Sequence, residues 1–121
     1  MIRGLRMATI WSEDLNNLLP FYRDTLGLKI LIEAEGFVAF GDTDAPGLAL
    51  GTHSELQGAT KEPARHMVAL DTDDLDAEYE RLKAAGVEFI ESPTQTPEQG
   101  PRIATLKDPE GNLVQLFSAQ T

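Results

Sequence analysis

The feature that most constrains the fold of this chain is an internal repeat of about sixty residues. The segment Met7–Leu28 matches the segment Met67–Val87, because each starts with Met, continues as a short apolar run, reaches an Asp-Leu pair and ends near a Gly. The offsets are 67 − 7 = 60 for the Met residues, 74 − 14 = 60 for the Asp residues and 86 − 27 = 59 for the Gly residues. This regular spacing predicts two copies of one supersecondary unit, about 1–60 and 61–121, within a single domain.

Each repeat has the pattern of a strand, a helix and three further strands. The helices are expected to be capped at Ser12 and Thr72 and to end at Gly27 and Gly86, where left-handed backbone is needed. Pro20 predicts a break in the first helix, because proline removes one backbone hydrogen bond. The later strands are expected at 29–32, 36–40 and 47–50 in the first repeat, and at 87–90, 102–106 and 113–117 in the second. The order βαβββ, used twice, predicts an α+β fold.

Charge and cysteine content narrow the classes of partner. Lys+Arg is 10 and Asp+Glu is 20, so the net charge is 10 − 20 = −10, which repels phosphate backbones and anionic lipid and predicts neither a nucleic-acid nor a membrane partner. The chain has no cysteine, which excludes disulfides and thiolate chemistry. No stretch resembles a signal peptide or a membrane span, so a cytoplasmic location is expected.

The doubled βαβββ unit and two motifs, FYRDTLGL at 21–28 and DPEGN at 108–112, resemble the vicinal oxygen chelate superfamily. That superfamily includes glyoxalase I, bleomycin-resistance proteins, fosfomycin-resistance enzymes and extradiol dioxygenases, and the resemblance covers essentially the whole chain. It implies a curved mixed sheet around a central cavity, helices on the outside and pairing of two chains as a homodimer. A fold by itself assigns no activity.

In metal-using members, the resemblance implies ligands at the start of the first strand of each repeat and on the last strand. The corresponding residues here are Met7, Leu50, Met67 and Gln115. A thioether is a soft ligand that suits Cu(I), and a single amide oxygen does not hold a divalent ion. We therefore expect no metal and no cofactor, with a divalent metal as the alternative.

His66 would be a ligand if the strand register were shifted by one residue. Strand alternation instead places it on the side of Val68 and Leu70, which are expected to face the helix, and away from the side of Met67.

The same alternation predicts an apolar cavity with a few polar groups, or a cavity that the protein's own side chains fill. The expected lining is Met7, Thr9, Trp11, Leu50, Met67, Ala69, Asp71, Arg102, Leu113, Gln115 and Phe117. Asp71 is a candidate general base or counter-charge, or a rim carboxylate in water. Arg102 is a candidate anion ligand, or a partner of a rim acid such as Glu98 or Glu110.

Three hypotheses follow. The first is a metal-independent protein of the bleomycin-resistance type that sequesters an aromatic or cationic molecule. The second is an enzyme, either a lyase or extradiol-dioxygenase-like protein with an unusual metal set (Gln115, His66, Asp71) or a metal-free isomerase with Asp71 as base. The third is a regulatory module with a vestigial cavity.

Overall fold

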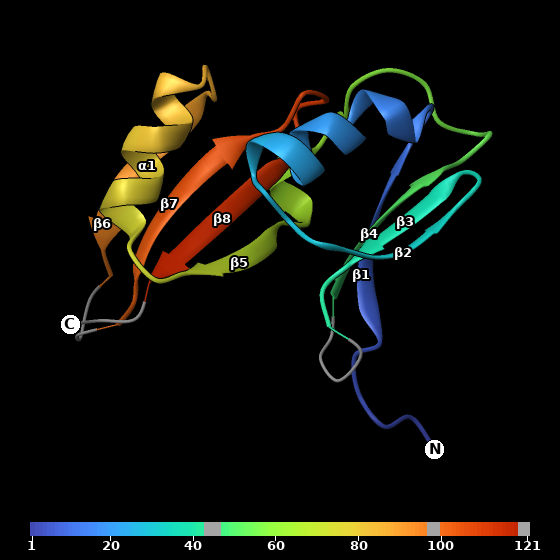
Figure 1. Cartoon of the computed structure of the whole chain (residues 1–121), viewed down its shortest axis with the longest axis horizontal. Helices are drawn as coiled ribbons and strands as arrows, with labels where there is room; N and C mark the ends of the chain where they lie inside the picture. The colour runs from blue at the N-terminus through green and yellow to red at the C-terminus, as the bar shows by residue number, and fades with distance from the viewer. Residues whose placement is uncertain (43–46, 97–99, 119–121) are drawn as a thin grey trace. The chain divides into compact units, whose positions relative to one another are not determined.

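The computed structural model describes residues 1–42, 47–96 and 100–118, and its contacts divide the chain into two compact units, Met1–Gly58 and Ala59–Thr121 (Figure 1). The boundary falls two residues before the end of the first repeat expected from the sequence. Each unit has its own sheet and its own helical segment.

The first unit runs as a strand, a helical segment and three strands. Its elements are β1 (Met7–Ser12), η1 (Leu15–Asn17), η2 (Phe21–Thr25), β2 (Ile30–Ala34), β3 (Phe37–Phe40) and β4 (Gly47–Thr52). The strand order in the sheet is β1-β4-β3-β2, in which β1 and β4 are parallel and the other neighbours antiparallel. Parallel neighbours need a long crossover, which the helical segment, β2 and β3 together supply.

The helical segment of the first unit is irregular. The 3-10 turn η1 ends at Asn17, and the π-helix η2 starts directly after Pro20. Proline has no N–H to donate to the carbonyl of Asn16, so the regular α-helical hydrogen bonding is interrupted at this point. The break predicted from Pro20 is confirmed.

The second unit repeats the order with a regular helix. Its elements are η3 (Pro63–Arg65), β5 (Val68–Thr72), α1 (Leu75–Ala84), β6 (Phe89–Gln95), β7 (Arg102–Lys107) and β8 (Leu113–Ser118). The strand order is β5-β8-β7-β6, the same topology as in the first unit, with β5 and β8 parallel. The α+β class and the doubled strand-helix-strand order are thereby confirmed. In the part of the chain that the structure describes, no helix is long and apolar enough to cross a membrane.

The N-caps are the aspartates of the two Asp-Leu pairs, and the prediction of Ser12 and Thr72 as caps was wrong. The carboxylate of Asp14 accepts a backbone N–H of η1 at 3.0 Å, and that of Asp74 accepts a backbone N–H of α1 at 3.1 Å. The hydroxyl of Ser12 instead accepts the N–H of Asp14 at 3.0 Å, and the hydroxyl of Thr72 donates to the carbonyl of Phe117 at 3.1 Å.

Each sheet has one face turned to its helical segment and an opposite face, which we call the open face. In the second unit the Tyr79 ring of α1 contacts the Phe89 ring at a centroid distance of 4.7 Å, and Phe89 pairs with Leu106. In the first unit the N–H of Leu15 donates to the Thr52 hydroxyl at 2.9 Å. Residues that alternate with these along each strand therefore lie on the open face.

The core of each unit lies between its sheet and its helical segment. Its largest fully buried side chains are Leu18, Tyr22, Val38 and Leu50 in the first unit and Leu75, Leu82, Leu106 and Val114 in the second. Full burial of one such aliphatic side chain contributes about 1.5–3 kcal/mol.

The DPEGN motif forms a turn that enters β8. The buried carboxylate of Asp108 accepts the N–H groups of Glu110 and Asn112, both at 2.9 Å, and also the Asn112 side-chain amide at 2.9 Å. Gly111 has φ +83°, which a residue without a Cβ adopts at no steric cost. The motif thus has a structural role in holding the start of β8.

Candidate functional site

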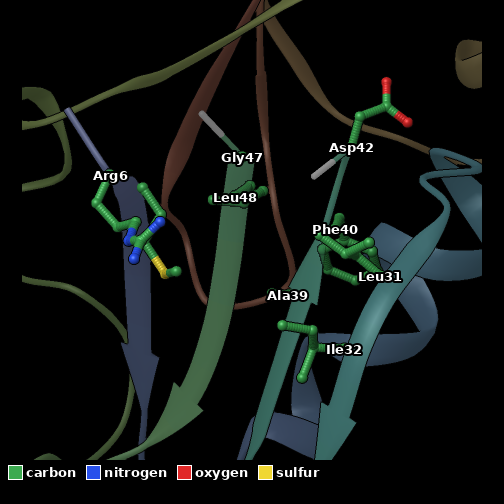
Figure 2. Close-up of a pocket in the computed structure, with 9 residues that line it drawn as sticks. Arg6, Leu31, Ile32, Ala39, Phe40, Asp42, Gly47 and Leu48 are labelled. Atoms are coloured by element: carbon green, nitrogen blue, oxygen red, sulfur yellow. The ribbon is translucent and has the colours of Figure 1, made fainter. Parts of the chain in front are cut away.

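A hollow of about 360 Å³ lies on the sheet of the first unit (Figure 2). All four strands contribute to it, together with the residue before β1 and a residue after β3. Its lining is Arg6, Met7, Leu31, Ile32, Ala39, Phe40, Asp42, Gly47 and Leu48. This volume falls in the range of small-molecule sites, which are concave and mostly apolar.

The central strands β4 and β3 contribute two small residues to the hollow, Gly47 and Ala39, and two large ones, Leu48 and Phe40. Figure 2 shows Arg6 and Ile32 at the two sides, with Leu48 and Ala39 between them. Gly47 faces Met7 across the parallel pair, and a Cβ at Gly47 would meet the carbonyl oxygen of Phe40 at 2.2 Å. No side chain larger than hydrogen fits at this position, so the backbone of Gly47 itself lines the hollow.

A register shift in β2 widens the lining at the other side. The pairing of β2 with β3 is irregular between Ile30 and Ile32, so Leu31 is an extra residue in the ladder. Both Leu31 and Ile32 are exposed, at 40% and 53% of their surface. Exposed aliphatic side chains beside a hollow offer apolar contact area to a ligand.

Two charged residues border the apolar lining. Arg6 is exposed next to β1, and the carboxylate of Asp42 points away from Phe40 and Leu31 in Figure 2. Within the described ranges, Arg6 and Asp42 take part in none of the ion pairs. The guanidinium is thus available for a ligand's anionic or carbonyl group.

Of the residues proposed from the sequence for the first unit, Met7 lines the hollow, and Thr9 and Trp11 lie on the open face. Thr9 pairs with Ala49, and Trp11 pairs with Gly51. The sequence reasoning missed the rest of the lining. The available signal was Ala39 in FVAF and the alternation of small residues in GLALG, which become informative only when β3 and β4 are known to be neighbours.

Five of the predicted residues lie on β5 or β8 at open-face positions of the second unit: Ala69, Asp71, Leu113, Gln115 and Phe117. Gln115 is half-buried and pairs with the buried Thr105, whose hydroxyl lies 3.4 Å from a Glu91 carboxylate oxygen. Asp71 is exposed, as expected for a rim carboxylate in water.

Leu50 does not belong to the predicted cavity lining. It is fully buried and pairs with Ile10 and Val38, in the row that faces the helical segment. The residue of the first unit that is equivalent to Gln115 is Ala49. Ala49 pairs with Thr9, and Gln115 pairs with Ala69, which lies 60 residues after Thr9. Leu50 is one residue beyond this equivalent position, and a shift of one residue along a strand moves the side chain to the other face.

Arg102 also lies on the opposite face from the one predicted. Its guanidinium donates to the carboxylate of Asp76 on α1, and this hydrogen bond holds the pKa of Arg102 above its ordinary value. The ion-pair partner of Arg102 is therefore Asp76 and not Glu110, which the sequence had suggested. Glu98, the other acid suggested, lies outside the described residues. Arg102 pairs with Ser118, which is on the helix side of β8, so alternation explains the difference.

The residues at the expected metal positions do not fit a divalent ion. Met7 and Met67 are thioethers, Ala49 offers only a methyl group and Gln115 a single neutral amide. His66 is exposed and precedes β5. Among residues 1–42, 47–96 and 100–118, no three His, Cys, Asp or Glu side chains gather in a way that could hold a metal.

Comparison with known families agrees with this architecture. The model of the Glyoxalase/Bleomycin resistance protein/Dioxygenase superfamily matches residues 4–116. The chain belongs to this superfamily, which confirms the resemblance drawn from the repeat and the two motifs.

Relatives cover nearly the full chain. The uncharacterized protein YwbC of Bacillus subtilis (strain 168) is 30% identical over 127 residues, covering 97% of this chain and 98% of its own. A superfamily member from Sphaerobacter thermophilus DSM 20745 has a TM-score of 0.75 at 27% identity, covering 97% of this chain and 98% of its own. A glyoxalase/dioxygenase from Nostoc punctiforme, 18% identical with a TM-score of 0.78 and coverage of 98% and 92%, shares the fold.

Proposed function

We propose that this protein binds a small, largely apolar molecule in the hollow of the first unit and does so without a divalent metal. The observation that carries the proposal is the hollow of about 360 Å³ with its mostly aliphatic and aromatic lining. Apolar surface supplies affinity in such a site, and a few polar groups orient the ligand. Arg6 is the polar group best placed for this, beside Met7.

Metal independence rests on the chemistry of the side chains. The superfamily's metal positions hold Met7, Met67, Ala49 and Gln115, which together provide no hard anionic ligand. A methionine beside the hollow has a different use, because its flexible thioether adapts to the shape of an apolar ligand.

An enzymatic role has less support. The proposed base Asp71 is exposed, and nothing among the described residues around it excludes water. Pairing of two copies and a cytoplasmic location remain predictions from the sequence.

The test is a methyl NMR screen with [13C-methyl]-methionine protein. The chain has three methionines, of which Met7 lines the hollow, Met67 lies in the second unit and Met1 is at the N-terminus. We expect members of a panel of small apolar carboxylates and ketones to shift the Met7 signal in a saturable manner while Met67 stays in place, with Met7→Leu assigning the signal.

The matched variant is Ile32→Glu, which places a charge at the exposed side of the hollow without touching the core. It should weaken binding of every compound that shifts the Met7 signal, because desolvating the new carboxylate opposes burial of an apolar ligand. A panel that leaves Met7 unshifted, or shifts that persist in Ile32→Glu, would count against the hollow as the site.

A further inference from the structure

A cluster of three aromatic rings lies on the first unit, apart from the hollow. It consists of Trp11 on β1, Phe37 on β3 and His53 directly after β4. The Trp11 ring centroid lies 6.5 Å from that of Phe37 and 5.9 Å from that of His53, with tilted and edge-on geometry respectively. Trp11 nevertheless keeps 47% of its surface exposed.

Gly51 makes room for the indole. A Cβ at residue 51 would meet the six-membered ring of Trp11 at 2.4 Å, so the ring occupies the volume in which any other residue would carry its side chain. Gly51 is also the residue paired with Trp11 on one side and with Phe37 on the other. The indole is thus seated on the sheet while much of its surface stays in water.

Hydrogen bonds of the backbone and of the His53 ring hold the neighbours of the indole in place. The N–H of His53 donates to the carbonyl of Ser12 at 2.8 Å, and the His53 Nδ1 accepts the N–H of Glu55 at 3.1 Å. The N–H of Thr52 donates to the carbonyl of Gly36 at 3.0 Å, next to Phe37. An aromatic surface that is fixed before a ligand arrives loses little entropy on binding.

The charge of the protein favours one kind of aromatic ligand. The net charge is −10, and a field of that sign concentrates cations at the surface. An exposed indole face attracts a planar ring by stacking and attracts a positive charge through its quadrupole.

We propose that Trp11, Phe37 and His53 form a binding platform for a planar, positively charged heteroaromatic ring. The platform is a second site on the first unit and goes beyond the function proposed for the hollow. Four residues along β1, about 13 Å, separate Trp11 from Met7, and none of the three aromatic residues lines the hollow. The two sites can therefore be tested separately.

The experiment is a titration of the full chain with N-methylquinolinium chloride, followed by the fluorescence of Trp11, the single tryptophan. We expect saturable quenching. Quinoline, the same ring system without the fixed charge, should bind about two- to fivefold more weakly at neutral pH, as expected for a cation above an exposed ring.

Variants separate the platform from the hollow. By ligand-observed NMR, Trp11→Ala and Phe37→Leu should each weaken N-methylquinolinium binding by at least about fivefold, since each removes a stacked ring or its support. Ile32→Glu, which tests the hollow, should leave this binding within twofold of the parent or slightly stronger. Circular dichroism and thermal melts check that each variant is folded.

Three outcomes would overturn the platform: quenching that rises linearly without saturation, binding that survives Trp11→Ala, or binding that is equally strong for quinoline. Loss of binding in Ile32→Glu alone would assign the probe to the hollow and would likewise overturn it. Failure of the Met7 screen leaves this result unaffected, because the two experiments report on different residues.

Discussion

The two units have the same strand order and matching registers between their first, third and fourth strands, and yet their open faces differ in chemistry. Their central rows, read across the four strands, are Thr9, Ala49, Ala39 and Ile32 in the first unit and Ala69, Gln115, Thr105 and Glu91 in the second. The first row is mostly apolar, and two of its residues, Ala39 and Ile32, line the hollow. The second is mostly polar, with Thr105 and Glu91 within 3.4 Å of each other.

The next row along the strands shows an exchange of large and small residues. In the first unit the indole of Trp11 lies against Gly51, whereas at the equivalent pair in the second unit the small acidic Asp71 stands beside the large Phe117. Each pair combines one large and one small residue. The large residue is on the first strand in the first unit and on the last strand in the second unit. The same backbone therefore presents an aromatic ring on the edge strand of one unit and on a central strand of the other.

The helix-facing rows differ far less. They are Ile10, Leu50 and Val38 in the first unit and Leu70, Leu116 and Ala104 in the second. Both rows are apolar because they bury surface against a helical segment, which is where most folding free energy arises. The comparison teaches that these rows maintain the fold, while the open rows are free to carry different sites.

The largest expected effect concerns the shared helix-facing core. Leu18→Ala and Leu82→Ala should each lower the free energy of unfolding by about 2–5 kcal/mol, since each removes a fully buried side chain. Urea denaturation followed by circular dichroism measures this loss. Ile90→Ala is the matched control, because Ile90 is 51% exposed and should change stability little. Equal losses in all three variants would contradict the division into faces.

The second effect concerns the exchange at Trp11 and Gly51. Gly51→Ala should cost about 1–3 kcal/mol, because the new Cβ would displace the indole. The same substitution in a Trp11→Ala background should cost much less, since the clash is gone, and a double-mutant cycle of urea melts measures the coupling. Additive costs would show that the indole does not occupy this space.

The third effect concerns the polar row of the second unit. Thr105→Val keeps the side-chain shape and makes the open face more like that of the first unit. Because the hydroxyl's contact with Glu91 is long, at 3.4 Å, stability should change by less than about 1 kcal/mol. A thermal melt is sufficient, and a large loss would assign the row a structural role that the first unit lacks.

The fourth effect tests the expected metal positions. After incubation with Ni, Zn, Fe(II) or Mn salts and desalting, we expect retention well below one ion per chain, because the donor set is poor. Gln115→Ala should leave even this small amount unchanged, as measured by elemental analysis. Near-stoichiometric retention that depends on Gln115 would favour the metal-dependent hypotheses.

The smallest effect concerns Arg102. Arg102→Ala should shift the melting temperature little, since its partner Asp76 is 65% exposed and exposed ion pairs are weak. It should also leave binding of the Met7-shifting compounds and of N-methylquinolinium unchanged, because Arg102 lies on the helix side. Reduced binding would restore its earlier assignment to an open-face site.

Much of the fold was predictable because its signals are local. The Asp-Leu pairs and Pro20 each act within one element, and the 60-residue offset is the recurrence of such local signals. Together they gave the doubled order and the break in the first helical segment. The site was less predictable. Leu50 was placed on the wrong face because it lies one residue beyond Ala49, the equivalent of Gln115, and alternation reverses the face at each residue. The face of Arg102 follows from its pairing with Ser118, which the sequence does not show.

The sequence by itself determined the repeat, the class of fold and the side chains at the expected metal positions, since these depend on residue identity and spacing along the chain. The tertiary structure decided that β1 lies beside β4 and that β4 lies beside β3. Only this pairing brings Met7 next to Gly47 and Trp11 next to Gly51. A hollow or a ring platform depends on which strands are neighbours. A long crossover joins β1 to its parallel neighbour β4, and the sequence of neither strand identifies the other as its partner.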